Sequence, residues 1–154
     1  MRTLLFSLLS IVAFGFAPAP VFRERPDDPE TVLRRLQGTW KVPRYELAGR
    51  TAYSKGEAYT IKIEKDLWTF FRSVDGGALS KSSSHTMKLD PKSTPAEIDL
   101  IAVHDPTFIF FGVYELKGDT LRFAFRTSTN GKKDRAKDLT PAPDTFFLQL
   151  ERQP

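Results

Sequence analysis

The sequence predicts an all-β protein: a single eight-stranded antiparallel up-and-down β-barrel with a short N-terminal helix. Three observations predict this fold. From residue 38 onward the chain contains eight short segments in which apolar and polar residues alternate, as in half-buried strands. Turn-forming residues separate most of these segments at hairpin spacing. No helical pattern interrupts them, so consecutive strands can pair in order and close on themselves.

Residues 1–17 are predicted to be a signal peptide. Arg2 supplies the positive start, and residues 4–17 form an uncharged apolar run of 14 residues. A helix of that length spans about 21 Å, which is short of the hydrocarbon core of about 30 Å. Cleavage after Gly15 or after Ala19 fits the small-residue spacing. We therefore expect export to the periplasm or the extracellular space, with no membrane span after cleavage; an uncleaved N-terminal anchor is the alternative.

The remaining chain divides into a disordered lead-in, residues 18–28, and one barrel domain, residues 29–154. The lead-in contains three prolines and five charged residues. Asp28 is suited to cap a helix that begins with Pro29, and Gly38 is suited to end it. The apolar side of this helix is formed by Val32, Leu33 and Leu36.

The first four strands are predicted from alternation and from the turns between them. Pro43 interrupts the first strand and predicts a bulge or an edge position there. Asp75-Gly76-Gly77 supplies the positive φ values that a tight hairpin needs. The apolar positions are Trp40, Val42, Tyr45 and Leu47; Tyr59, Ile61 and Ile63; Trp68 and Phe70; and Met87 and Leu89, next to His85.

The last four strands follow the same pattern. Lys117-Gly118-Asp119 predicts a tight turn between the sixth and seventh strands, and a polar loop, residues 128–144, contains the turn pair Asn130-Gly131. A two-sheet sandwich would need a long crossover, and only this loop is long enough, so we favour the barrel. The positions on one face are Ile98, Leu100 and Ala102; Phe108, Phe110, Gly112, Tyr114 and Leu116; Leu121, Phe123 and Phe125; and Phe146, Leu148 and Leu150.

The triplet Gly38-Thr39-Trp40, at the start of the first strand, resembles the lipocalin signature. The resemblance implies a structural plug in which Trp40 closes one end of the barrel. In that family an arginine near the end of the last strand stacks across the tryptophan, and Arg152 stands at the matching place. An indole is a large apolar plug, and a guanidinium adds a cation–π contact and hydrogen-bond donors.

Longer segments resemble an uncharacterised lipocalin-like domain family that is abundant in planctomycetes. The resemblance spans about residues 33 to 152 and implies an exported domain with no assigned activity. The seventh strand often carries a cysteine in that family, whereas this chain has Phe123-Ala124-Phe125. The matching segments are residues 36–42, 45–49, 88–91, 95–100 and 112–122.

The sequence offers little material for catalysis, and we expect no enzyme activity, no catalytic residue, no metal site and no cofactor. The chain has two histidines and no cysteine. The series Ser82-Ser83-Ser84-His85 lacks an oriented third group and an oxyanion hole. His104-Asp105 could contribute to a metal site only if His85 or another carboxylate came close. The net charge of +4 is scattered, so we expect no nucleic-acid partner.

The aromatic residues allow two interpretations. They either fill the barrel or line a shallow calyx, open at one end, that binds a small lipophilic molecule. With a filled barrel, the protein would instead act through its outer surface on an envelope protein partner. Ile109, Phe111 and Val113 lie on the opposite face of the sixth strand from Phe108 and Phe110, and so point away from the barrel interior. We expect the short helix to cover these three residues; otherwise they would form an exposed apolar patch. The candidate calyx residues are Trp68, Phe70, Phe108, Phe110, Tyr114, Phe123 and Phe125.

Overall fold

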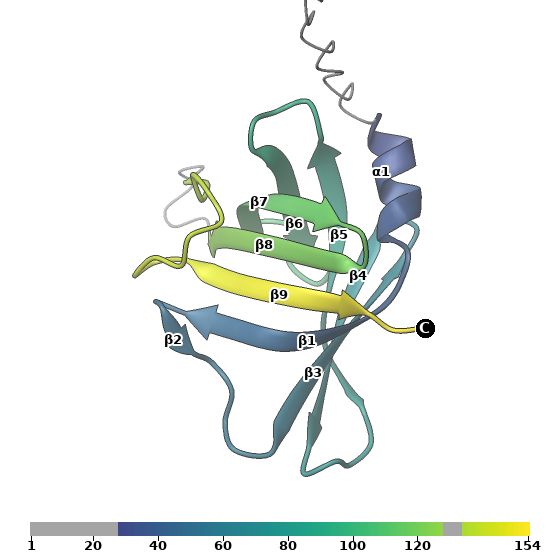
Figure 1. Cartoon of the computed structure of the whole chain (residues 1–154), viewed down its shortest axis with the longest axis vertical. Helices are drawn as coiled ribbons and strands as arrows, with labels where there is room; N and C mark the ends of the chain where they lie inside the picture. The colour runs from purple at the N-terminus through teal and green to yellow at the C-terminus, as the bar shows by residue number, and fades with distance from the viewer. Residues whose placement is uncertain (1–27, 128–133) are drawn as a thin grey trace, which may run out of the picture.

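The structure is a computed structural model that describes residues 28–127 and 134–154 (Figure 1). The predicted signal peptide, nearly all of the lead-in and the turn pair Asn130-Gly131 lie outside the described residues. Within the described part of the chain, none of the helical structure has the length and apolar character needed to cross a bilayer.

The chain forms the predicted closed up-and-down barrel of eight antiparallel strands. Each strand pairs with the next one along the chain, and β1 also pairs with β9, which closes the ring (Figure 1). The strands are β1 (Gly38–Leu47), β3 (Glu57–Glu64), β4 (Leu67–Val74), β5 (Ser80–Asp90), β6 (Ala96–Ala102), β7 (Ile109–Lys117), β8 (Thr120–Thr127) and β9 (Phe146–Arg152).

The short strand β2 (Arg50–Thr51) was not predicted. It pairs only with the end of β1 and stands outside the closed ring. The two strands are joined by the expected turn, in which Ala48 and Gly49 both have positive φ. Asp75 and Gly76 likewise adopt the positive φ values predicted for the hairpin between β4 and β5.

The helix α1 (Pro29–Leu36) has the predicted ends. The carboxylate of Asp28 accepts hydrogen bonds from the backbone N–H of Thr31 at 3.0 Å and from its hydroxyl at 2.6 Å. Val32 and Leu36 bury their side chains in the barrel interior. The helix and the C-terminus lie at the same end of the barrel (Figure 1), which we call the closed end. The opposite end, where β1 stops and β9 begins, is the open end.

The bulge predicted at Pro43 is present. The pairing of β1 with β9 shifts register between Lys41 and Arg44. Both Trp40, on one side of the bulge, and Tyr45, on the other, belong to the interior cluster. The bulge therefore lets β1 serve the closed and open ends of the same interior.

The outward-facing residues of β7, Ile109, Phe111 and Val113, were expected either to lie under the helix or to form an exposed patch, and the structure corrects both expectations. Phe111 is only 4% exposed, and Val113 is buried, but α1 does not cover them. Val113 packs with Ala136 in a second, outer cluster, and the guanidinium of Arg135 lies 5.6 Å from the centre of the Phe111 ring. The segment after residue 134 thus covers these residues, so neither the helix cover nor the exposed patch exists.

Arg135 fastens this covering segment to the barrel wall. Its guanidinium donates hydrogen bonds to the backbone carbonyls of Ile98 (3.1 Å) and Gly112 (2.7 Å). It also forms ion pairs with Glu97 at 3.0 Å and Asp99 at 2.6 Å. Charged donors that reach both backbone and carboxylate oxygens are among the stronger hydrogen bonds.

Candidate functional site

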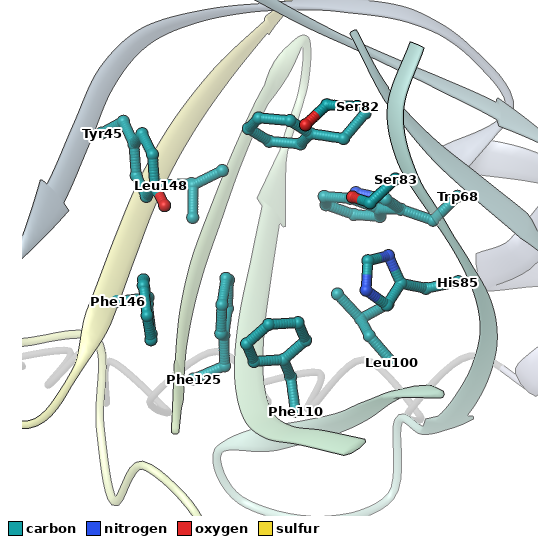
Figure 2. Close-up of a pocket in the computed structure, with 11 residues that line it drawn as sticks. Tyr45, Trp68, Ser82, Ser83, His85, Leu100, Phe110, Phe125, Phe146 and Leu148 are labelled. Atoms are coloured by element: carbon teal, nitrogen blue, oxygen red, sulfur yellow. The ribbon is translucent and has the colours of Figure 1, made fainter. Parts of the chain in front are cut away.

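The barrel interior contains a pocket of about 170 Å³ near its open end (Figure 2). Every strand of the closed ring except β3 contributes to the lining: β5 supplies polar side chains, and the others supply aromatic or aliphatic ones. We call it the open-end pocket. Its lining residues are Tyr45, Trp68, Phe70, Ser82, Ser83, His85, Leu100, Phe110, Phe125, Phe146 and Leu148.

One side of the open-end pocket is a wall of aromatic rings. Phe125 and Phe146 stack with their centroids 5.4 Å apart and their planes at 13°. Phe110 meets Phe125 edge to face at 4.9 Å, and the ring of Tyr45 lies nearly parallel to that of Phe146, with their centroids 6.5 Å apart. Each ring is held by its neighbours, so the wall is pre-formed rather than assembled around a ligand.

The inner limit of the pocket is the packed core. Trp68 is buried, and its ring meets Phe123 edge to face at 4.7 Å. Leu148 and Leu121 are fully buried around them. The aromatic residues therefore both fill the barrel, toward the closed end, and line a cavity, toward the open end.

The opposite side of the pocket is polar and comes from β5. Figure 2 shows Ser82, Ser83 and His85 facing the row formed by Tyr45 and Phe146 across the cavity. The pairing of β4 with β5 shifts register at this point: Phe70 pairs with Ser83, whereas Phe71 pairs with Lys81. Ser82 is the extra residue of a β-bulge, and the bulge brings two successive serines to the same cavity.

His85 is the buried member of this polar side. Its side chain is 6% exposed, and its Nδ1 atom is buried without a hydrogen-bond partner in the described structure. The ring lies 5.4 Å from that of Phe110. Burial lowers the pKa of His85 below its usual range, and the nearby His104 adds to the lowering. The imidazole is therefore neutral near pH 7.

The predicted calyx residues divide between three places. Trp68, Phe70, Phe110 and Phe125 line the open-end pocket. Phe108 lies just before β7, is 37% exposed and meets Phe110 edge to face at 4.9 Å, so it stands at the mouth.

The other two predicted residues lie away from the pocket. Phe123 is fully buried in the core beneath Trp68. Tyr114 is buried in the interior cluster and borders a separate surface hollow near Arg35. Their places in the alternation are right, but they lie too far toward the closed end.

Sequence reasoning missed several lining residues. Phe146 and Leu148 share one face of β9, so alternation could have found them. Tyr45 faces the pocket only because of the bulge that precedes it. Ser82 and Ser83 could not have been found, because their placement depends on the register between two strands.

The two histidines border a common shallow hollow beside the pocket, together with Ser83, Asp105 and Phe108. His104 is exposed, whereas His85 is buried. Across residues 28–127 and 134–154, no group of three or more His, Asp or Glu side chains is placed to hold a metal ion. The carboxylate of Asp105 accepts hydrogen bonds from the N–H and hydroxyl of Thr107, which lowers its pKa.

At the closed end, Trp40 and Arg152 have the geometry expected from the lipocalin resemblance. Trp40 is fully buried, and the guanidinium of Arg152 lies 4.2 Å from the centre of its ring. The indole N–H of Trp40 donates to the carbonyl of Leu36 at 2.9 Å. Arg152 also donates to the carbonyls of Arg35 at 2.5 Å and Gln37 at 2.6 Å, at the C-terminal end of the helix.

Gly38 is required by this arrangement. Its φ is 121°, a conformation that side chains rarely adopt, and an added Cβ would lie 3.3 Å from Nη1 of Arg152. The structure therefore places all three predicted plug residues in one closure that joins the helix, the first strand and the last strand.

Fold and site together define the class: an up-and-down β-barrel, closed at one end by a tryptophan and an arginine, with a small two-sided pocket at the other. Comparison with protein-family models finds none that matches the chain, and the search of curated proteins finds no match either.

Proposed function

We propose that this protein is an exported, non-enzymatic, lipocalin-like barrel that binds a small apolar molecule in the open-end pocket. The observation that carries the proposal is the pocket itself, because a barrel of eight strands is just wide enough to be filled by its own side chains. Here six aromatic residues surround about 170 Å³ instead of filling it.

The volume sets the size of the molecule. Sites for drug-sized ligands measure about 300–1,000 Å³, whereas an apolar cavity of about 150 Å³ accepts benzene. The open-end pocket belongs to the second range. We therefore expect a ligand with a single ring or a comparable short chain.

Binding can be tested with small apolar probes such as toluene, indole and cyclohexanol. Saturable binding should quench the fluorescence of Trp68, which lines the pocket, and raise the midpoint of thermal unfolding. Ser83→Phe should abolish both effects, because Ser83 is half-buried in the lining and a larger side chain would occupy the cavity. Lys81→Phe, exposed and outside this lining, is the matched control. Absence of saturable binding across the panel would refute the proposal.

The export part of the proposal is supported by Arg2 and the apolar run of residues 4–17. Expression of the full chain in a bacterial host should yield a mature form outside the cytoplasm. Mass spectrometry should place its first residue at Phe16 or Pro20. A full-length chain recovered only from the cytoplasm would contradict export, and a full-length chain held in the membrane would favour the anchor.

An envelope interaction module is the second candidate, and one observation favours it. The exposed large apolar side chains in the described ranges all lie at the ends of strands or in loops around the open end: Leu47, Val74, Leu79, Val103 and Phe108. Such clustering is typical of a contact surface. Crosslinking in envelope fractions should then capture one specific protein, and Val103→Glu should abolish the capture, whereas Lys88→Glu, near the closed end, should not.

A further inference from the structure

The polar side of the open-end pocket carries information about the ligand that its volume does not. His85 is only 6% exposed, and its Nδ1 atom is buried without a hydrogen-bond partner in the described structure. A buried nitrogen without a hydrogen bond costs free energy, so such atoms are rare in stable folds and call for an explanation. Nδ1 is closed off from the empty cavity as well as from solvent, so a ligand can reach only the rest of the imidazole, which lines the cavity.

The arrangement of the lining fixes where the polar part of a ligand would lie. Ser82, Ser83 and His85 all come from β5, and the bulge at Ser82 brings the two serines to the cavity alongside the histidine. The wall across from them is formed by Phe125, Phe146 and their neighbours (Figure 2). A ligand that matches both sides has an apolar ring on one side and a hydrogen-bonding group on the other.

The charge of the ligand follows from the residues that line the pocket. None of the described lining residues is Asp, Glu, Lys or Arg. Burying an ionised group without a partner of opposite charge is far more costly than burying a hydroxyl. Because His85 is neutral near pH 7, it does not supply that opposite charge. A carboxylate or an ammonium group is therefore disfavoured, and a neutral group is favoured.

We propose that the ligand is a neutral single-ring molecule with one hydroxyl group, of the phenol class, whose hydroxyl forms a hydrogen bond with the imidazole of His85 while its ring lies against Phe110, Phe125 and Phe146. The inference rests on the proposed function, since it specifies the molecule bound in the same pocket. In this assignment the bond is made at Nε2, because Nδ1 is closed off from the cavity; with the imidazole proton on Nε2, the ring donates to the hydroxyl oxygen. Ser83 is the next polar group toward the mouth and can receive or supply a second hydrogen bond.

The test compares phenol, toluene and benzoate, which differ at a single substituent of the ring. Dissociation constants are measured by NMR titration at pH 7.5, following the indole N–H signal of Trp68, with that of Trp40 at the closed end as the internal reference. A purely apolar pocket would favour toluene, because phenol loses hydrogen bonds to water when it is buried. We expect phenol to bind at least as tightly as toluene, and benzoate to bind at least tenfold more weakly than phenol.

Variants at His85 test the assigned contact. His85→Leu should weaken phenol binding about tenfold, the upper range for one neutral hydrogen bond, and change toluene binding less than about twofold. His104→Leu is the matched control, because His104 is exposed and does not line the open-end pocket. Far-UV circular dichroism establishes that each variant is folded. The dissociation constants of the three probes for the unmodified protein test the proposal without any variant.

The outcomes separate this inference from the proposed function. If toluene binds, but the ratio of the dissociation constants of phenol and toluene is the same for the unmodified protein and His85→Leu, the phenol assignment is overturned. The proposal that the pocket binds a small apolar molecule then still stands. Benzoate binding as tight as phenol binding overturns the neutral class. If none of the three molecules binds, the proposed function itself is contradicted for ligands of this size.

Discussion

Replacing Trp40 by alanine tests the closure of the barrel most directly. The indole is fully buried, and it contacts Arg152 on one face and donates a hydrogen bond to the carbonyl of Leu36. Truncating a buried tryptophan costs about 3–5 kcal/mol. The buried carbonyl that loses its donor adds to this cost, by about 1–3 kcal/mol where nothing replaces the bond. We expect a loss of about 5 kcal/mol in the free energy of unfolding.

A loss of this size is close to the total stability of many small domains, which is about 5–15 kcal/mol. Trp40→Phe therefore accompanies the alanine variant. It keeps an aromatic ring beneath Arg152 but removes the indole N–H that serves Leu36, so we expect it to cost about 2 kcal/mol. Leu47→Ala is the control, because Leu47 lies on the same strand, is exposed and should change stability by less than about 0.5 kcal/mol.

The measurement is urea unfolding followed by far-UV circular dichroism, which does not depend on the tryptophan that is removed. In both Trp40 variants Trp68 is the remaining tryptophan, so its fluorescence reports separately on the interior near the open end. Coincident transitions by the two probes indicate two-state unfolding. A loss below about 1.5 kcal/mol for Trp40→Ala, with an unchanged slope, would refute the role of Trp40 in closing the barrel.

Three further predictions concern other parts of the structure. Arg152→Lys should cost about 2 kcal/mol in urea unfolding, because a lysine cannot both lie across the Trp40 ring and donate to two carbonyls; no loss would contradict the closure. Gly112→Ala should cost about 2 kcal/mol in stability and so lower the midpoint of thermal unfolding, because the added Cβ would lie 2.7 Å from the carbonyl oxygen of Ala124. An unchanged midpoint would show that β7 and β8 can move apart at no cost. Because the pKa of His85 is lowered by burial, the unfolded chain takes up the proton first as the pH falls below 6.5, so stability should decrease from pH 7 to pH 5. His85→Leu should remove most of this decrease and His104→Leu should keep it, whereas the same decrease in both variants would assign it to other groups.

Much of the fold could be predicted because its signals are local. Alternation along each strand and turn residues such as Asp75 and Gly76 depend on neighbours in the sequence, and the eight strands of the ring are found where these signals place them. Arg152 and Trp40 lie far apart in the sequence, and their contact was expected only through the resemblance to lipocalins.

The candidate site was only partly predictable, for two physical reasons. Depth along the barrel axis is set by strand pairing, so alternation gave the inward face for both Phe110 and Phe123 but not which of them meets the cavity. The bulge at Ser82 and the cover over Phe111 depend on register and on a loop without periodicity. The burial of His85 beside the cavity has no counterpart in the sequence around it.

The junction of the first and last strands also determines when the protein can fold. Arg152 binds the carbonyl of Gln37, which lies 115 residues earlier in the chain. A ribosome that has released everything but the final strand has therefore produced a sheet with two unpaired edges and an uncovered helix end. Contacts between such distant residues form slowly, because the intervening chain must first be ordered. For the export proposed above, this delay would keep the chain unfolded until its last residues have been made.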